Sequence, residues 1–315
     1  MSAVSPRPVI LDTDWWTDVD DVAAARVLVW AEREGLVEIA GLVLDAWMPD
    51  SVASLDAFFT AEGRPQLPIG VDYAATDFGG TPPYQTKMAA AQHSRSNLDA
   101  LAATEFYRRI LTAAQRKVDL ICIGFGNALA ALLASAPDEI SPLTGLALTA
   151  EKVNRLWWMA GKWPVGSENN FARSDRARKS AHYIVDRWPT SITFLGYEVG
   201  DGVLTGGGLA ESATTDLLAQ ALADHGSPGG RSSWDPMLTL LACIGDPARA
   251  GYDVVAGTAD VDAVTGINSF AASPRGKHSY VRKLHPDNWY ATAIDSILEQ
   301  RTRKISGGGL DAVDK

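Results

Sequence analysis

The chain has 315 residues, of which 46% are hydrophobic and 21% are charged, as in a soluble globular protein with a sizeable core. Its formal net charge of −10 at pH 7 argues against a nucleic-acid backbone or an anionic membrane surface as a partner. No uninterrupted apolar run approaches the roughly 20 residues needed to cross a bilayer, and the N-terminus contains no apolar signal core. We therefore expect a cytoplasmic protein.

The two cysteines, Cys122 and Cys243, each lie within an apolar run. Neither has a second cysteine or a histidine beside it, which argues against a metal or catalytic role. The pattern is typical of reduced thiols in the core of a cytosolic protein.

Apolar runs of strand length alternate along the chain with stretches of helix length. The predicted strands are residues 8–11, 37–45, 67–71, 118–124, 153–160 and 192–196. The predicted helices are residues 22–30, 50–63, 98–114, 128–134, 174–187, 237–244 and 287–303. This alternation predicts an α/β fold with a Rossmann-like core, in which an open, mostly parallel sheet is flanked by helices.

Two segments lack this pattern. Residues 72–96 contain glycine and proline pairs and several aromatic residues, and a loop of this length is usually a lid or a binding loop. Residues 252–270 alternate loosely, which predicts a hairpin at the sheet edge. Because the composition shows no break, we expect a single domain over residues 1–305 and a flexible tail at 306–315.

Five carboxylates follow the first predicted strand within ten residues: Asp12, Asp14, Asp18, Asp20 and Asp21. They lie at the carboxyl end of that strand, which is where open α/β sheets bind ligands. Two carboxylates about 4 Å apart repel by roughly 4 kcal/mol at an effective dielectric of 20, whereas a helix N-terminus offsets only about 0.3–1 kcal/mol. Some acids are therefore protonated, or they point apart into water, or a cation such as Ca²⁺ or Mg²⁺ lies among them.

Five motifs occur in one order along the chain. They are Asp12-Thr13-Asp14 with Asp20-Asp21-Val22-Ala23, then Ile123-Gly124-x-Gly126-Asn127, Met159-Ala160-Gly161, Glu168-x-Asn170 and Ser233-Trp234-Asp235-Pro236. Their order and approximate spacing resemble those of the inosine–uridine-preferring nucleoside hydrolases, a family of ribonucleoside N-ribohydrolases. The resemblance covers residues 8–300 and implies a nucleoside-hydrolase-like fold.

The resemblance also implies one Ca²⁺ ion at the carboxyl ends of the strands. By position, its ligands would be Asp14, Asp21, Asp235 and the backbone carbonyl of Ile123. The implied activity is Ca²⁺-dependent hydrolysis of the N-glycosidic bond of ribonucleosides, which yields free base and ribose. Asp14 would act as general base on a water held by the metal, whose pKa the cation lowers.

Further positions match family residues that contact the sugar: Asp20 and Asp45 match positions that meet the ribose, and Glu168 and Asn170 match positions that hold its 5′ side. Glu168 would support the oxocarbenium-like transition state that glycoside hydrolysis passes through. The resemblance further implies a nucleoside as the small-molecule partner, a role in purine salvage and a homo-oligomer, either a dimer or a tetramer.

Three features depart from the family pattern: Trp234, the pair Trp15-Trp16, and a segment at 171–178 that is about two residues longer than usual. The longer segment leaves either Asn169 or Asn170 as the sugar contact. Trp234 occupies the place where many members carry a histidine that protonates the leaving base, and the purine-preferring branch has an aromatic residue there. We therefore assign Trp234 to the substrate-binding and catalytic set, where it would stack on a protonated purine; packing of its helix is the alternative. Trp15 and Trp16 replace a small turn and bring the usual specificity into question.

Two other functions fit parts of the sequence. The chain could bind nucleosides or sugars on the same scaffold without turnover, because the histidine is missing and Trp15-Trp16 reshape the site. A haloacid dehalogenase-like phosphohydrolase also begins with a strand followed by Asp-x-Asp, but it requires Thr or Val where this chain has Trp16.

Overall fold

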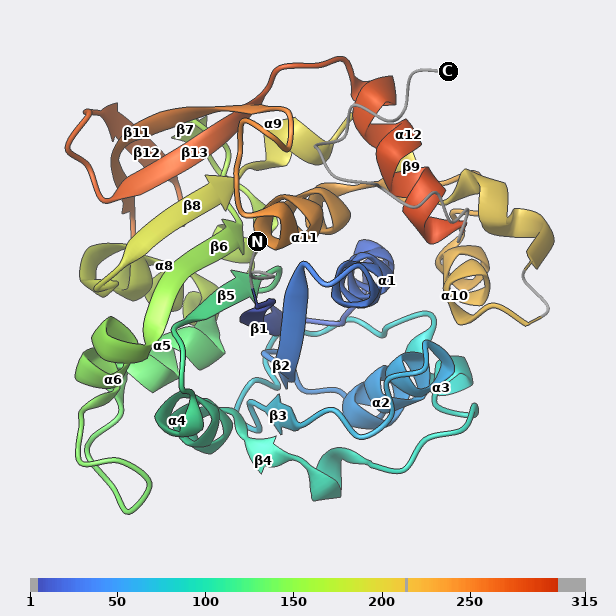
Figure 1. Cartoon of the computed structure of the whole chain (residues 1–315), viewed down its shortest axis with the longest axis horizontal. Coiled ribbons are helices and arrows are strands. Elements are labelled where there is room, and N and C mark those ends of the chain that lie inside the picture. Colours follow the sequence, from blue (N-terminus) through green and yellow to red (C-terminus); the bar gives the residue numbers. More distant parts are fainter. Residues whose placement is uncertain (1–4, 213–214, 300–315) are drawn as a thin grey trace.

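A computed structural model describes residues 5–212 and 215–299 of the chain (Figure 1). Helices cover both faces of one eleven-stranded sheet, whose strand order is β4-β3-β2-β1-β5-β6-β8-β13-β11-β12-β7. A separate pair joins β9 to β10. The predicted α/β class with a mostly parallel sheet is confirmed. The predicted tail at 306–315 lies outside the described residues, so the single-domain boundaries stay a prediction.

The strands of the large sheet are β1 (Arg7–Thr13), β2 (Val37–Leu44), β3 (Ile69–Val71), β4 (Leu101–Ala102), β5 (Val118–Cys122), β6 (Val153–Met159), β7 (Val165–Gly166), β8 (Ser191–Leu195), β11 (Tyr252–Val261), β12 (Asn268–Ala272) and β13 (His278–Lys283), and the separate pair is β9 (Leu204–Thr205) with β10 (Arg231–Ser232). The α-helices are α1 (Asp20–Arg33), α2 (Ser51–Ala61), α3 (Gln85–Met88), α4 (Ala103–Ala113), α5 (Asn127–Ala134), α6 (Gly145–Lys152), α7 (Asn169–Ala172), α8 (Asp175–Arg187), α9 (Tyr197–Gly200), α10 (Leu217–His225), α11 (Trp234–Ile244) and α12 (Asp287–Leu298). Two 3₁₀ helices, η1 (Asn97–Asp99) and η2 (Gly207–Ser212), complete the described elements.

The direction in which the sheet grows reverses beside β1. The chain moves from β1 outward through β2, β3 and β4, and then returns so that β5 pairs with the other free edge of β1. From β5 it grows the opposite way through β6 and β8, again in parallel. The carboxyl ends of β1 and β5 therefore flank the topological switch point, where open α/β sheets bind ligands.

The far end of the sheet contains a strand that the sequence pattern missed. The predicted hairpin is present as the antiparallel pair β11 and β12. Between it and the parallel strands lies β13, which pairs in parallel with β8 and antiparallel with β11. The short edge strand β7 and helix α6 were also not predicted.

The predicted helix at 98–114 begins later than expected, at Ala103. The Ser96 hydroxyl accepts from the Leu98 N–H, and the Asp99 carboxylate accepts from the Ser96 N–H at 2.8 Å. These local bonds close the turn η1, and Leu98 is left 94% exposed instead of packing into the core. Serine and aspartate side chains compete with helix formation because they hydrogen-bond to nearby backbone N–H groups.

The sheet divides the apolar core into two layers. One lies against α1, α2, α10, α11 and α12, and the other lies against α4, α5, α6 and α8. The neighbours Trp157 and Trp158 on β6 enter opposite layers, because successive side chains of a strand alternate between its faces. Cys122 and Cys243 are buried and free, as predicted. Within the described residues, no helix has the length and apolar character to cross a bilayer.

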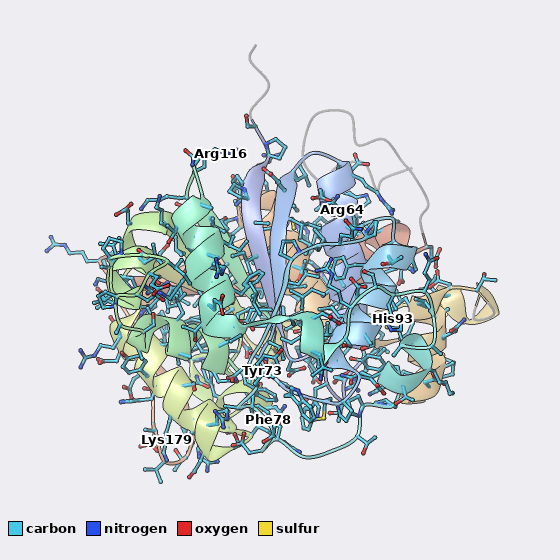
Figure 2. The ribbon with its side chains drawn as sticks, turned by 90° about the horizontal axis from the view of Figure 1, so that it is seen from below. Arg64, Tyr73, Phe78, His93, Arg116 and Lys179 are labelled. Carbon is cyan, nitrogen blue, oxygen red and sulfur yellow. The ribbon has the colours of Figure 1, made fainter. Side chains whose placement is uncertain are left out.

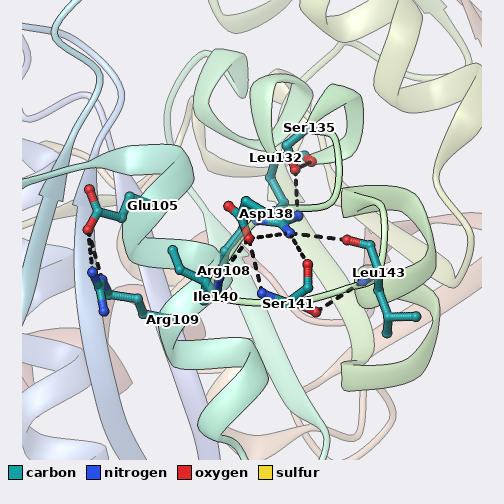
Figure 3. Close-up of polar contacts among 9 residues, drawn as sticks. All are labelled: Glu105, Arg108, Arg109, Leu132, Ser135, Asp138, Ile140, Ser141 and Leu143. Atoms are coloured by element: carbon teal, nitrogen blue, oxygen red, sulfur yellow. Dashed lines mark hydrogen bonds and ion pairs between the residues drawn. The ribbon is translucent and has the colours of Figure 1, made fainter.

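One buried arginine anchors α4 to the segment that follows α5 (Figure 3). Arg108 is 1% exposed, and its guanidinium donates to both carboxylate oxygens of Asp138 at 2.7 Å. It also donates to the Ser141 carbonyl at 2.9 Å and the Leu143 carbonyl at 3.1 Å. The hydrogen bonds that Asp138 accepts from Arg108 are the main reason that its pKa is lowered to about 2.

We expect Arg108→Met to lower the free energy of unfolding by about 2–4 kcal/mol, because it strips buried acceptors of their donors. The adjacent Arg109 is the matched control, since it is exposed and, among the described residues, forms its ion pair with Glu105 on its own helix. Arg109→Met should cost about 0.5 kcal/mol or less. Urea unfolding of both variants is the measurement, and equal losses would contradict the assignment.

Candidate active site

A cavity of about 470 Å³ opens at the carboxyl ends of β1, β5, β6 and β8, above the switch point of the sheet. Its lining residues are Asp14, Trp16, Thr17, Asp18, Asp20, Asp21, Ile123, Met159, Lys162, Ser167, Glu168, Asn169, Asn170, Tyr197, Arg231, Trp234 and Asp235. Every predicted site residue except Asp45 is among them.

The turn between β1 and α1 separates its two tryptophans. Trp15 has φ +44°, a left-handed conformation that is rare for a bulky residue. Its indole is fully buried and donates to the Ser54 hydroxyl at 3.0 Å, and the Gln85 amide donates to the Trp15 carbonyl. This anchoring turns the next residue, Trp16, toward the cavity wall. Trp15 therefore stabilises the turn in the protein interior, whereas Trp16 lines the cavity.

Three carboxylates converge on one point of the cavity. Asp20, Asp21 and Asp235 each offer an oxygen within 4.8 Å of the other two. They occupy the first turns of α1 and α11, and the Asp235 backbone N–H donates to the Asp20 carboxylate at 3.1 Å. Both helices thus direct their positive N-terminal ends at the acids, which offsets part of the negative charge.

The acids at this point have strongly perturbed protonation. Burial, reinforced by the neighbouring carboxylates, raises the pKa of Asp14, Asp20 and Asp235 well above the usual value. Burial raises the pKa of Asp21 to about 7, although the Thr13 hydroxyl and the Trp15 N–H donate to it and limit the rise. A cation among them would offset this cost.

Asp18 is neutralised by a residue far away in the sequence. Arg231 donates to both of its carboxylate oxygens, at 2.9 and 2.7 Å. Burial alone would raise the pKa of Asp18, but the hydrogen bonds and charge of Arg231 outweigh burial and hold that pKa below its usual value. The sequence placed no basic residue among the five acids, and the fold supplies one.

The donor set fits a hard divalent cation. The converging ligands are carboxylate oxygens, and both Asp14 and Ile123 line the same cavity. Oxygen donors at this density are typical of Ca²⁺ and Mg²⁺ sites. Asp14 is not one of the three acids whose oxygens meet within 4.8 Å, and its Oδ1 accepts from the Trp16 N–H at 3.2 Å. Its role as a metal ligand stays a prediction, as does that of Ile123.

Asp45 lies behind the cavity wall, where it is fully buried. Its Oδ2 accepts from the Gly126 N–H at 2.9 Å, and Asp45 also forms a buried group with Asp12 and Cys122. The Tyr107 hydroxyl donates to Asp12, and burial raises the pKa of both acids, to about 7 for Asp45. The predicted sugar contact of Asp45 stays a prediction.

Glu168 and Asn170 line the same cavity as the acids that follow β1. The Glu168 carboxylate accepts from the Gly161 N–H at 2.6 Å and from the Asn170 N–H, so it fixes the loop after β6. Burial raises its pKa to about 7 despite these bonds. The Asn170 amide donates to the Met159 carbonyl at 2.9 Å, whereas Asn169 is exposed at the cavity.

An aromatic wall is formed by Trp234 and Tyr197, whose rings stack with centroids 5.3 Å apart. The Trp234 indole N–H donates to the Tyr197 carbonyl at 2.7 Å, and a Cβ at Gly200 would come within 2.5 Å of the indole. Trp234 is therefore tightly packed and 9% exposed, yet it still lines the cavity. Packing and a contact with ligand are both compatible with this position.

The aromatic residues of the 72–96 segment pack on the body of the protein rather than entering the cavity. Phe78 stacks on Phe125 with ring centroids 3.9 Å apart, and the Tyr73 hydroxyl donates to the Ala100 carbonyl at 2.9 Å. In the view of Figure 2, Tyr73 and Phe78 lie in the lower half of the picture, and Arg64 and Arg116 lie in the upper half. Phe78 also contacts Trp16, so the segment supports the cavity wall from behind.

Sequence reasoning missed Lys162, Tyr197 and Arg231, which all line the cavity. Lys162 directly follows the Met159-Ala160-Gly161 motif, and Arg231 lies three residues before Trp234. Tyr197 comes just after strand β8 ends. Their positions just after a strand or beside a motif were the features of the sequence that could have identified them as site residues.

No protein-family model matches the sequence, and no curated protein matches it either. Solved structures do match over nearly the whole chain. An inosine-uridine preferring nucleoside hydrolase from Bacillus anthracis has 14% sequence identity and a TM-score of 0.69, over 93% of this chain and 99% of that one. A purine-preferring ribonucleoside hydrolase from Gardnerella vaginalis has 17% identity and a TM-score of 0.68, over 93% and 100%.

A third match is the type III effector protein XopQ complexed with adenosine diphosphate ribose. It has 14% identity and a TM-score of 0.67, over 94% of this chain and 93% of that one. At these identities the likeness concerns the fold. The chain therefore has the nucleoside hydrolase fold, with its cavity and converging acids at the switch point of the sheet.

Proposed function

We propose that the chain is a hydrolase that cleaves the N-glycosidic bond of ribonucleosides with the help of Ca²⁺. The observation that carries this proposal is the convergence of Asp20, Asp21 and Asp235 in one cavity at the switch point of a nucleoside hydrolase fold. The matching structures favour this function over the haloacid dehalogenase-like alternative, because they share the fold across nearly the whole chain.

Asp14, Asp21, Asp235 and the Ile123 carbonyl would hold the ion, and the geometry adds Asp20 to this set. When bound, the ion supplies positive charge that lowers the pKa of a water molecule and repays the burial of the acids. Mg²⁺ is the alternative that the oxygen donors also accept.

Asp14 is the proposed general base. Its carboxylate lies in the cavity beside the converging acids and takes the proton of the attacking water. The water oxygen then forms a bond to the anomeric carbon of the ribose. At the same time the bond from that carbon to the nucleobase nitrogen breaks, and the nucleobase leaves with the electron pair. Glu168 and Asn170, which line the same cavity, hold the sugar as its ring gains oxocarbenium character.

We further propose that purine nucleosides are the favoured substrates in a purine salvage reaction. Trp234 and Tyr197 offer a rigid aromatic wall at the cavity, and a flat two-ring base covers more of such a wall than a pyrimidine does. A protonated purine leaving group gains additional attraction from an aromatic face. The purine-preferring hydrolase among the matching structures is consistent with this assignment.

The second candidate is a protein that binds nucleosides or ribose derivatives without cleaving them. The specific observation in its favour is that Trp234, which cannot donate a proton to a leaving base, is fully engaged through its indole N–H with Tyr197. XopQ, which shares the fold, was solved with bound adenosine diphosphate ribose. Release of free base from inosine, guanosine, uridine or cytidine separates this candidate from the hydrolase.

Metal binding should stabilise the protein more at high pH than at low pH. The metal-free folded state holds protons on acids with raised pKa values, such as Asp21 at about 7, so its stability falls as pH rises from about 4 to 7. Ca²⁺ must displace those protons, so millimolar Ca²⁺ should raise Tm more at about pH 8 than at about pH 5. Thermal unfolding with Ca²⁺, Mg²⁺ and chelator is the measurement. If neither Ca²⁺ nor Mg²⁺ changed Tm, the proposed metal site would be contradicted.

Asp14→Asn should lower kcat by about 10²–10⁴-fold, because the variant keeps the shape of the carboxylate but cannot accept a proton. Asp175→Asn is the control, since Asp175 is an exposed acid at the start of α8. Both variants are assayed for release of hypoxanthine from inosine, with Tm measured in parallel. Near-normal turnover by a folded Asp14→Asn would remove Asp14 from the role of base.

A pair of substitutions at Trp234 tests stacking separately from packing. Trp234→Leu keeps apolar bulk but loses the aromatic face, whereas Trp234→Phe keeps a face. We expect Trp234→Leu to lower kcat/KM for inosine about tenfold more than for uridine, and Trp234→Phe to restore most of the difference. The two substrates are compared within each variant, so a general loss of stability cancels. Equal losses on both substrates would mean that Trp234 only packs.

A further inference from the structure

We propose that Lys162 selects substrates whose ribose carries a phosphate at its 5′ position. The inference rests on the proposed function and on the family resemblance, which implies that Glu168 and Asn170 hold the 5′ side of the ribose; both residues line the cavity. Lys162 lies in the same wall of the cavity, because Gly161, the residue before it, donates its N–H to Glu168.

The backbone of Lys162 is held in place from both sides by one buried residue. Its N–H donates to the Asn268 side-chain oxygen at 2.9 Å, and its carbonyl accepts from the Asn268 amide at 2.8 Å. Asn268 is fully buried on β12. This double contact fixes the point from which the lysine side chain enters the cavity.

Lys162 is exposed, and the stem of its side chain packs on one side. A Cβ at Gly166 would lie within 2.7–3.1 Å of the Lys162 stem carbons, so the stem packs closely on that glycine. The ammonium lies 5.4 Å from the centroid of the Tyr197 ring. Aromatic rings attract cations at such distances, and a lysine stem held along apolar surface loses little more freedom on binding.

The ammonium has no close ion-pair partner among the described residues, although its charge acts on Glu198, whose pKa is raised by burial and partly lowered by Lys162. Within residues 5–212 and 215–299, no carboxylate forms an ion pair with Lys162. Both oxygens of the nearby Glu168 accept backbone N–H groups, and Glu198 accepts from the Trp163 N–H at 3.0 Å. By contrast, Arg231, the other cation of the cavity, is taken up by Asp18.

Two exposed polar side chains of the same loop, Ser167 and Asn169, also line the cavity. Together with Lys162 they can surround a phosphate with one ammonium, one hydroxyl and one amide. Charge-assisted hydrogen bonds to phosphate oxygens are strong, and lysine binds phosphate as a point charge. The acceptable ligands are a nucleoside 5′-phosphate or a sugar 5-phosphate.

The test compares inosine 5′-monophosphate with inosine, in the presence of Ca²⁺, for the wild type and for Lys162→Met, Lys162→Arg and Lys179→Met. Lys162→Met keeps the stem and removes the charge. Lys179 is the matched control, because it is 70% exposed on α8, outside the cavity (Figure 2). The readout is the ratio of the two kcat/KM values, with Kd measured by calorimetry. Competition by ribose 5-phosphate against ribose distinguishes a sugar phosphate from a nucleotide as the source of the phosphate.

The wild type should prefer the phosphorylated substrate, and Lys162→Met should lower that preference by about tenfold or more. Lys162→Arg should retain most of it, and Lys179→Met all of it. A ratio that Lys162→Met leaves unchanged, or a wild type that cleaves inosine but not its 5′-phosphate, overturns the inference and leaves the proposed function standing. If neither compound is bound or cleaved, the proposed function itself fails, and the inference fails with it.

Discussion

The central constraint on the site is the electrostatic repulsion among the acids that follow β1, and the surrounding groups are arranged so that they reduce it. Asp14, Asp20, Asp21 and Asp235 are buried in one cavity, and burial raises their pKa values instead of letting water screen them. Three features offset this cost within the protein: the N-termini of α1 and α11, the Asp235 N–H that Asp20 accepts, and bound protons. These compensate only partly, so the arrangement makes physical sense as the apo form of a cation site.

The local pattern of the sequence predicted the parallel strands and the acids that follow the first of them. A run of apolar residues indicates a buried strand, and acidic residues directly before an apolar helical stretch indicate the start of a helix. The local pattern could not predict that Arg231 would neutralise Asp18, since 213 residues separate the pair and only the fold brings them together. Nor could it separate Trp15 from Trp16, because a left-handed φ depends on what Ser54 and Gln85 offer nearby.

The two adjacent tryptophans show how fold and specificity can share one turn. Trp15 is fixed by buried hydrogen bonds and by contacts with Phe58 and Tyr84, so it has little freedom to vary. Trp16 is backed by Phe78 and by the Arg173 guanidinium, 4.5 Å from its ring centroid. Trp16, Trp234 and Tyr197 all line the cavity, so under the proposed function these aromatic side chains would shape the space that receives the base.

The two ends of the large sheet carry a consequence for self-association. The sheet terminates in β4 and β7, which are two residues long each. Such short strands leave few unpaired N–H and C=O groups for a neighbouring chain to extend. The terminal strands β4 and β7 therefore offer a second copy little template for strand-to-strand pairing. At these two ends of the sheet, association through helix and loop surfaces, where side-chain complementarity decides which partner is accepted, is favoured over backbone pairing.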